Sequence, residues 1–379
     1  MLNSIRLAWV AGSWFAGMAL SVSAAAPVAK PAPAEVLALA ERVADWQLRT
    51  PSRWKPHEWH NGALYTGYMA LSRVSARPDY EKAMLELGRK MEWGLGPRAY
   101  DADDHCVVQT WTELYFKYKD PAMIAPATKA FDAILANPAS SDLEFTKPRS
   151  RDQWSWCDAL FMAPPAWLRL SLATGNGAYL DFMVENWWKT SDYLYDRSEH
   201  LYFRDSKYFT MREPNGAKIF WSRGNGWVMG GLARLLPLLP ADHPARGRFE
   251  QQFREMAAKV VTLQQPDGLW RASLLDPEAY PAQETSGSGF FCFALSWGIN
   301  YGLLDRATYE PAVLRAWHAL ANCVNADGKL THVQPVGQTP KTFDPEHSDV
   351  FGVGAFLLAG SEVYRLVGGG KAEEKSSGK

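Results

Sequence analysis

The chain has 379 residues, of which 47% are hydrophobic and 13% aromatic, so it is long enough to bury a large core in one barrel-sized unit or in two or three smaller domains. Its formal net charge of −1 gives no indication of the basic surface that nucleic-acid-binding proteins present, and no nucleic-acid partner is expected. The 17 tryptophans suit either of two purposes, filling a core or stacking against sugar rings.

The N-terminal segment has the pattern of a secretory signal peptide. Arg6 precedes an apolar run at 7–20, and small residues follow at 21–26, which is the order typical of exported proteins. We expect residues 1–26 to be removed, with cleavage after Ala24 or Ala26, and the mature protein to be periplasmic or secreted. The apolar run is too short to span a bilayer comfortably and no later segment is longer, so no membrane partner is expected.

Helical patterns fill most of the remaining chain, and two kinds alternate. One kind is apolar on all sides and begins with polar or small residues, which predicts a buried helix; the other has a single apolar stripe, which predicts a covering helix. The apolar helices are expected at 59–71, 103–115, 158–172, 222–239, 284–304 and 348–366. The striped helices are expected at 34–49, 78–92, 121–136, 177–194, 243–264 and 306–323.

This alternation is an internal repeat, and it predicts the fold class. Repeats of this length usually form arrays, but the spacing of the polar starts is too irregular for an open solenoid. Six helical hairpins closed into a ring, an all-α (α/α)6 toroid, accommodate such variable loops. We expect one catalytic domain over 34–366 and a disordered tail at 367–379, where Gly, Lys, Glu and Ser predominate.

Extended segments are few. Residues 201–205 and 218–221 flank Pro214-Asn215-Gly216, a favourable turn, and predict a short β-hairpin over one mouth of the ring. A second turn at 265–270 leads into another short extended piece. The four cysteines, Cys106, Cys157, Cys292 and Cys323, have no CxxC spacing, so we expect no zinc site and buried free thiols in preference to disulfides.

Asp158 is the first candidate for chemistry. It lies among Trp154, Trp156, Cys157 and Phe161, and such apolar surroundings raise the pKa of a carboxyl group and make it a proton donor near neutral pH. An Asp that caps the helix beginning after it is an equally good interpretation.

A second acidic run and one arginine complete the candidates from the residues alone. Asp103 and Asp104 begin another apolar helix, and a carboxyl facing Asp158 across the mouth would suit general acid–base work on a glycoside. One of the two is expected to cap its own helix instead. Arg223 begins a further apolar helix and could bind a substrate carboxylate in bidentate fashion or pair with a neighbouring Asp.

Three motifs resemble those of the unsaturated glycuronyl hydrolases, the glycoside hydrolase family 88 and 105 group, which includes unsaturated rhamnogalacturonyl hydrolases. They are WSRGNGW at 221–227, DALFM at 158–162 and ETSGS at 284–288. The resemblance covers about 35–366 and implies an (α/α)6 barrel. It also implies an oligosaccharide substrate whose non-reducing end carries the 4,5-unsaturated uronate that polysaccharide lyases leave.

The resemblance implies an unusual hydrolysis. Asp158 would protonate the vinyl ether at C4 and help water add at C5, after which the hemiketal rearranges and the glycosidic bond breaks. The second family aspartate matches the Asp103/Asp104 run, and we choose Asp104 because it adjoins the inner helix. The predicted substrate-binding residues are Arg223, Trp227, Trp59, His105, Trp221, Asn225 and Lys207. No metal or cofactor is implied, and we expect a monomer or weak dimer.

The chain departs from the family at one position. Many members have a histidine in the loop before the RGNGW motif, whereas here no histidine lies between His200 and His243. Lys207, Arg204 or Asp205 takes its place, or the subsite differs, so rhamnogalacturonan, arabinogalactan-type and ulvan-like fragments all remain candidate substrates.

Other functions fit the same toroid. A conventional inverting glycosidase would use the same two acidic sites, and a polysaccharide lyase would use a tyrosine, with Tyr208 or Tyr115 as candidates. A non-catalytic sugar-binding protein would use only the tryptophan-rich mouth.

Overall fold

The computed structural model describes residues 28–370. The predicted signal peptide at 1–26 lies outside this part of the chain, as do residues 371–379 of the predicted tail. The described chain is predominantly helical, with one short two-stranded sheet, and no described helix combines the length and the apolar composition needed to cross a membrane.

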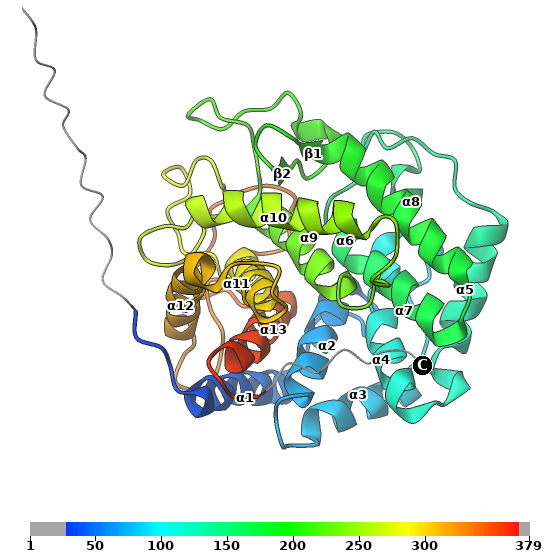
Figure 1. Cartoon of the computed structure of the whole chain (residues 1–379), viewed down its shortest axis with the longest axis horizontal. Helices are drawn as coiled ribbons and strands as arrows, with labels where there is room; N and C mark the ends of the chain where they lie inside the picture. Colours follow the sequence, from blue (N-terminus) through cyan, green and yellow to red (C-terminus); the bar gives the residue numbers. More distant parts are fainter. Residues whose placement is uncertain (1–27, 371–379) are drawn as a thin grey trace, which may run out of the picture.

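Apolar helices form a closed inner ring (Figure 1). Each contacts its neighbours in chain order, and the last one packs against the first and closes the ring. The inner helices are α2 (Trp59–Ser72), α4 (Val108–Tyr118), α6 (Ala159–Met162) with α7 (Pro164–Thr174), α9 (Ser222–Leu235), α11 (Thr285–Asn300) and α13 (Val350–Leu366). Nearly every side chain of α9, α11 and α13 is buried, as expected for helices that are apolar on all sides.

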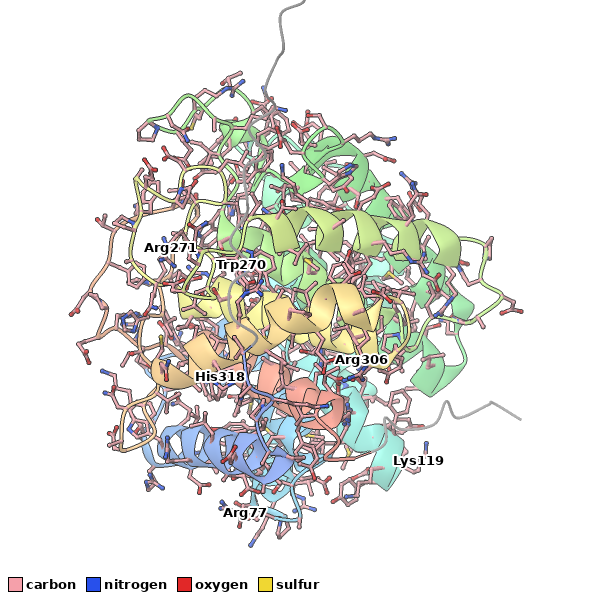
Figure 2. The ribbon with its side chains drawn as sticks, turned by 60° about the vertical axis from the view of Figure 1, so that its left-hand side comes forward. Arg77, Lys119, Trp270, Arg271, Arg306 and His318 are labelled. Carbon is pink, nitrogen blue, oxygen red and sulfur yellow. The ribbon has the colours of Figure 1, made fainter. Side chains whose placement is uncertain are left out.

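Striped helices cover this ring from outside. They are α1 (Pro33–Arg49), α3 (Asp79–Lys90), α5 (Ala125–Ala136), α8 (Gly177–Leu194), α10 (Arg246–Thr262) and α12 (Arg306–Asn322). The first outer helix, α1, packs against the last inner helix, α13, so the two ends of the described chain complete one hairpin. Polar side chains such as Arg306 of α12 lie on the outside (Figure 2). The predicted (α/α)6 toroid is confirmed.

The inner position after Asp158 is occupied by two helices, where the sequence predicts a single one. α6 ends at Met162 and α7 begins at Pro164, because Pro164 and Pro165 have no backbone N–H with which to continue the ladder. The Gln109 amide donates hydrogen bonds to the freed carbonyls of Phe161 at 2.8 Å and Met162 at 3.3 Å. Short 3-10 helices precede other elements: η1 (Ala102–His105), η2 (Pro121–Met123), η3 (Ser150–Asp152) and η4 (Ser206–Tyr208).

The predicted β-hairpin is wrong in its pairing. Strand β2 (Leu201–Tyr202) pairs antiparallel with the preceding β1 (Tyr195–Asp196) and not with 218–221. The predicted turn does form, and Gly216 adopts φ +85°, but it joins only a single bridge between Arg212 and Lys218.

The segment at 218–221 has a different partner. Trp221 bridges to Ser273, and the Leu274 N–H donates to the Phe220 carbonyl at 3.0 Å. The second predicted turn therefore leads into an extended piece as expected, and this piece lies beside the entry to α9.

One hydrophobic core runs through the described chain. Trp111, Trp167, Trp187 and Trp270 are fully buried in it, so these tryptophans fill the core and offer no face to a sugar. The four cysteines are buried free thiols, as predicted.

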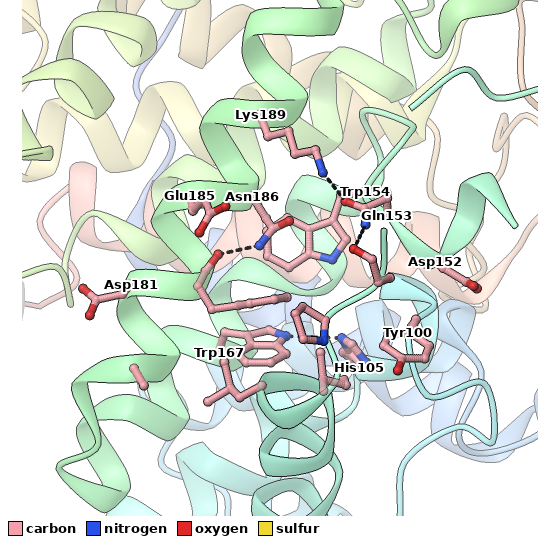
Figure 3. Close-up of a pocket in the computed structure, with 16 residues that line it drawn as sticks. Tyr100, His105, Asp152, Gln153, Trp154, Trp167, Asp181, Glu185, Asn186 and Lys189 are labelled. Carbon is pink, nitrogen blue, oxygen red and sulfur yellow. Dashed lines mark hydrogen bonds between the residues drawn. The ribbon is translucent and has the colours of Figure 1, made fainter. Parts of the chain in front are cut away.

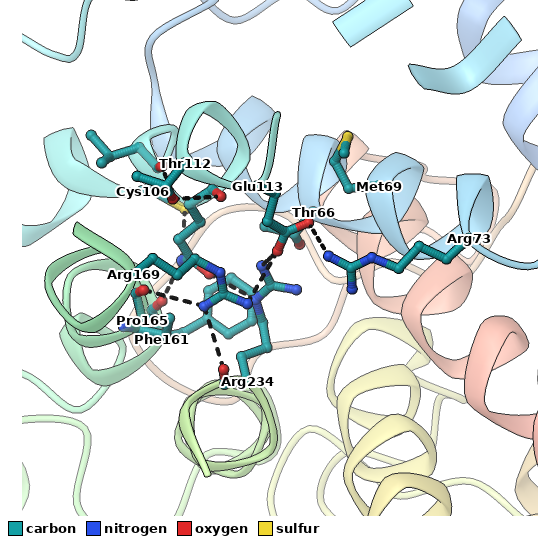
Figure 4. Close-up of polar contacts among 12 residues, drawn as sticks. Thr66, Met69, Arg73, Cys106, Thr112, Glu113, Phe161, Pro165, Arg169 and Arg234 are labelled. Atoms are coloured by element: carbon teal, nitrogen blue, oxygen red, sulfur yellow. Dashed lines mark hydrogen bonds and ion pairs between the residues drawn. The ribbon is translucent and has the colours of Figure 1, made fainter. Parts of the chain in front are cut away.

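The C-terminal halves of several inner helices meet at a buried ion cluster (Figure 4). Glu113 of α4 is paired with Arg234 of α9 at 2.7 Å, Arg169 of α7 at 3.1 Å and Arg73, which caps α2, at 2.7 Å. We call these four residues the Glu113 cluster.

Candidate active site

A cavity of about 460 Å³ lies where the N-terminal ends of inner helices meet the loops that enter them. Its lining comes from the start of α2, η1, the loops before α6 and α9, the segment after β2 and the segment at 336–341. The lining residues used below are Trp59, Asp103, Arg151, Asp158, Arg204, Trp221 and Lys341. We call this space the catalytic cavity.

Asp158 lines this cavity. It occupies the cap position of α6, yet its side chain makes no capping hydrogen bond within residues 28–370, so capping does not explain it. The Cys157 thiol donates to Asp158 Oδ2 at 3.4 Å, and Arg204 Nε lies 3.5 Å from the same oxygen. The surroundings are therefore less apolar than the sequence predicts, because a guanidinium faces the carboxylate.

Asp103 is the second carboxyl of the cavity. It belongs to η1 and pairs with Arg151 Nη2 at 2.6 Å. Burial raises the pKa of Asp103 to about 7, with the charges of Asp101 and Asp158 adding to the rise and that of Arg151 opposing it. Burial therefore favours the protonated form of Asp103.

The expectation that Asp104 faces the site is wrong. Asp104 is buried outside the cavity lining, where the Arg98 backbone N–H donates to its Oδ2 at 2.7 Å and Arg98 Nη2 donates to Oδ1 at 2.5 Å. The physical reason is the 3-10 turn: the Asp101 carboxylate accepts the Asp103 N–H at 3.1 Å, and this turn directs Asp103 and Asp104 into different surroundings.

His105 also lies elsewhere. It borders a second cavity of about 340 Å³, together with Trp154 and Trp167 (Figure 3). Its Nδ1 accepts a hydrogen bond from Trp167 Nε1 at 3.3 Å, and its Nε2 donates to the Ala99 carbonyl at 2.8 Å. Burial lowers its pKa, so His105 is a neutral structural residue and does not reach the catalytic cavity.

Arg223 is buried beneath the cavity and is not part of its lining. Its Nη1 donates to the Gln334 carbonyl at 2.6 Å and its Nη2 to the Pro335 carbonyl at 2.8 Å. Within residues 28–370 the guanidinium makes no ion pair with an aspartate and instead holds the backbone of a distant loop. Glu284 of the ETSGS motif assists, since it caps α11 and accepts the Gln334 N–H at 3.2 Å.

The other predicted binding residues divide between cavity and core. Trp59 and Trp221 line the cavity, and Trp221 Nε1 donates to Gln334 Oε1 at 2.8 Å. Trp227 is fully buried, with its ring centroid 4.3 Å from that of Phe290.

Two more of the predicted binding residues contact other residues of the protein and do not line the cavity. The buried Asn225 side chain exchanges hydrogen bonds with the Tyr202 backbone and fixes β2 beside α9. Lys207 lies near the mouth, where its Nζ donates to Gln338 Oε1 at 2.7 Å.

Sequence reasoning did not nominate Arg151 at all, and it left Arg204 as one of three substitutes for the absent histidine. The two arginines are arranged alike. Arg151 lies between Asp103 and Asp101, and Arg204 lies between Asp158 and Asp205. In each case the guanidinium contacts a carboxyl of the catalytic cavity on one side and a second carboxylate, outside the cavity lining, on the other.

This arrangement is suited to general acid–base chemistry. A buried carboxyl that keeps its proton near neutral pH can donate it, and its partner can receive one. No group of three or more His, Cys, Asp or Glu side chains in residues 28–370 could hold a metal ion.

Comparison with known proteins shows which family the chain is similar to. The model of glycosyl hydrolase family 88 matches residues 35–367. The chain is 40% identical over 343 residues to the unsaturated 3S-rhamnoglycuronyl hydrolase of Formosa agariphila. The aligned residues cover 88% of this chain and 91% of that protein.

Solved structures agree with this match. A glycosyl hydrolase family 88 protein from Bacteroides vulgatus is similar with a TM-score of 0.80 and 32% identity, covering 89% of this chain and 100% of that one. A protein described as a polysaccharide lyase is similar with a TM-score of 0.80 and 32% identity, covering 88% and 97%. The chain belongs to glycosyl hydrolase family 88.

Proposed function

We propose that this protein removes a 4,5-unsaturated uronate from the non-reducing end of lyase-generated oligosaccharides. The observation that carries the proposal is the pair of carboxyls, Asp158 and Asp103, in one cavity. Hydration of a vinyl ether requires a proton at C4 and an activated water at C5, and this pair keeps one proton available near neutral pH because the pKa of Asp103 is raised to about 7.

The proposed roles follow from this pair. Asp158 transfers the proton to C4, and the pair takes up the proton that water loses when its oxygen bonds to C5. The product is a hemiketal at C5, whose ring opens to a ketone and exposes C1 as a hemiacetal that releases the remaining sugar. Asp103 replaces Asp104 as the second catalytic residue, and Trp59 and Trp221 contribute aromatic walls.

We further propose that the sugar released is a 3-sulfated rhamnose, as the name of the Formosa agariphila relative indicates for that protein. Lys341 supports this choice. It is an exposed side chain at the cavity, without a hydrogen bond or ion pair to any residue in the described part of the chain. A free ammonium group at the mouth can bind a sulfate ester beyond the uronate.

The test follows the ultraviolet absorbance of the C4=C5 double bond in an unsaturated uronyl-rhamnose disaccharide, with and without the 3-sulfate. Wild-type protein should abolish the absorbance of the sulfated substrate faster, and Asp158→Asn should bind it and leave the absorbance unchanged. A matched control is Asp196→Asn, since Asp196 lies in β1 and pairs with Lys218 outside the cavity.

The same assay separates the other candidates. The similarity to a protein described as a lyase makes a lyase the second candidate, and a lyase would create this absorbance from saturated polymer. An inverting glycosidase would release saturated uronate without any absorbance change, and a sugar-binding protein would alter neither substrate.

We also propose that the protein is exported. Residues 1–26 support this through their charged start, apolar core and small-residue end. N-terminal sequencing of the mature protein should begin after Ala24 or Ala26, and an intact Met1 in the cytoplasmic fraction would contradict export.

A further inference from the structure

We infer that Arg204 binds the carboxylate of the unsaturated uronate, a role for which the residues alone make Arg223 a candidate. This inference rests on the proposed function, because it concerns how that substrate is held. Arg204 lies in the loop after β2, at a place where a histidine was expected, and it lines the catalytic cavity.

The Arg204 guanidinium is fixed on one edge. The other edge faces Asp158, and we call it the open edge because its Nε has no hydrogen-bond partner among residues 28–370. On the fixed edge, Nη1 donates to Asp205 Oδ2 at 2.7 Å, and the Arg204 Cζ lies 4.7 Å from the centre of the Phe145 ring. The Arg204 backbone carbonyl accepts the Cys157 N–H at 2.8 Å, so the loop is tied to the segment that carries Asp158. Only 6% of the residue is exposed.

The open edge contains Nε, a buried nitrogen with no hydrogen-bond partner among residues 28–370. Nε lies 3.5 Å from Asp158 Oδ2, close enough for electrostatic attraction but without a hydrogen bond. A buried charged donor left unpaired is costly, so this N–H is expected to receive an acceptor in the bound state. Nε and Nη2 form one edge of the planar fork, which matches the two oxygens of a carboxylate.

The other cations near the cavity are less suited. Nε of Arg223 is also buried without a hydrogen-bond partner among residues 28–370. Both Nη groups of Arg223 donate to the carbonyls of Gln334 and Pro335, so no edge of its fork has two free donors, and Arg223 is outside the cavity lining. Arg151 gives Nε and Nη2 to Asp101, and its Nη2 also contacts Asp103. Lys341 is exposed at the mouth, where it suits the next sugar.

The position of Arg204 also suits the reaction. The carboxylate of the unsaturated uronate is attached to C5, the neighbour of C4. A carboxylate held on the open edge of Arg204, beside Asp158, therefore places the double bond next to the Asp158 carboxyl. Arginine stays charged at any working pH, so this contact does not titrate as a histidine contact would.

The test compares the free acid and the methyl ester of the unsaturated disaccharide, because the ester removes the charge and keeps the double bond. Wild-type protein should prefer the acid in kcat/KM. Arg204→Met should lower kcat/KM for the acid by about 10- to 100-fold, the loss of a charged hydrogen-bonded pair, mainly through KM. The same variant should change kcat/KM for the ester far less, so the preference for the acid over the ester disappears.

Three further variants make the result decisive. Arg204→Lys keeps the charge without the fork and should retain part of the preference. Arg212→Met is a matched control in the same loop and should keep the wild-type preference, because within residues 28–370 its guanidinium donates hydrogen bonds only to the Phe209 and Met211 carbonyls. Arg223→Lys should lower the melting temperature and still leave the preference intact.

The inference is overturned if Arg204→Met lowers kcat/KM for the acid and the ester equally. It is also overturned if Arg223→Lys removes the preference for the acid while Arg204→Met retains it. Circular dichroism melts identify a variant that has not folded, and Arg204→Lys then provides the comparison. If wild-type protein hydrolyses neither acid nor ester, the proposed function itself fails, which is distinct from activity without any effect of Arg204.

Discussion

At the scale of single residues, the adjacent aspartates Asp103 and Asp104 should respond to substitution in different ways. Asp103→Asn removes the carboxyl that keeps a proton in the cavity and should lower kcat by about 10²- to 10⁴-fold. Asp104→Asn weakens the contact with Arg98 outside the cavity, so it should destabilise the fold by about 1–3 kcal/mol and lower kcat less than about tenfold. Steady-state kinetics and thermal melts of both variants check this, and the reverse order would assign the second catalytic role to Asp104.

Asp101 should influence the reaction without touching the substrate. It holds Arg151 through two hydrogen bonds of 2.8 Å, and its negative charge contributes to the raised pKa of Asp103. Asp101→Asn removes that charge, which makes ionisation of Asp103 easier and lowers its pKa. Activity that needs the protonated carboxyl should therefore decline at a lower pH than in the wild type.

The measurement is the pH profile of kcat/KM for wild type and Asp101→Asn. Its alkaline limb should begin near pH 7 in the wild type, as expected for a carboxyl pair whose proton is held on Asp103, with a pKa raised to about 7, and should move to lower pH in the variant. Asp104→Asn serves as the control whose limb stays in place. An Asp101→Asn profile with reduced height and an unmoved limb would mean that Asp101 acts only through the structure.

The place of a single residue in the site could be predicted from the sequence only where its neighbours along the chain determine it. Asp158 was identifiable because it lies in a short apolar run. The choice between Asp103 and Asp104 depends on the 3-10 turn, which their common neighbours do not reveal. The position of Arg223 depends on carbonyls 111 and 112 residues away along the chain, a contact that no spacing indicates.

At the scale of elements, the inner helices pack closely enough to require glycine at their contacts. A Cβ added at Gly354 of α13 would lie 2.4 Å from the Ala63 carbonyl oxygen of α2. Gly354→Ala should therefore destabilise the protein by about 1–3 kcal/mol, the typical result of overpacking.

Gly247 provides the matched control on an outer helix. In the described part of the chain, no atom beyond its chain neighbours and its own helix backbone lies within 4 Å of a Cβ added there, so Gly247→Ala should stabilise the protein by about 0.5–1 kcal/mol through helix propensity. Denaturant melts of the two variants give the comparison, and equal melting midpoints would show that the contact between α2 and α13 can relax.

Helices could be predicted more reliably than strand pairs because their hydrogen bonds are local. The predicted boundaries of α8 coincide with the observed Gly177–Leu194. The predicted hairpin was wrong because the sequence indicates only its turn at Pro214–Gly216, which is a local feature. The partners of Tyr202 and Trp221 depend on the segments that lie beside them in the fold, which are β1 and the segment at Ser273.

At the scale of the whole molecule, the repeat predicted the closed ring, but it did not predict how charge is distributed between the two ends. Carboxyl–guanidinium pairs form the catalytic cavity at the N-terminal ends of the inner helices. The Glu113 cluster joins α2, α4, α7 and α9 at their C-terminal halves (Figure 4). The Glu113 carboxylate therefore links these neighbouring inner helices through charge as well as through packing.

The Glu113 cluster should make stability depend on acid pH. Burial alone would raise the pKa of Glu113, but the charges of Arg73, Arg234 and Arg169 outweigh burial and lower it from 4.5 to about 2. A carboxyl whose pKa is lowered in the folded state stabilises fully above its unfolded pKa and loses this effect as the pH falls through its folded pKa. The difference corresponds to roughly 3 kcal/mol, present above about pH 4.5 and lost between about pH 4.5 and 2.

Glu113→Gln isolates this contribution, because the amide keeps the shape and removes the charge. Three arginines then face no carboxylate in the cluster, so the free energy of unfolding near neutral pH should fall by about 3–5 kcal/mol. Urea unfolding at a series of pH values should show the gap between wild type and variant narrowing as the pH drops below about 4.5. A gap that stays constant down to pH 2 would mean that protonation of Glu113 does not remove its contribution, so the loss in the variant would come from the altered hydrogen bonds of the amide and not from the charge at this end of the toroid.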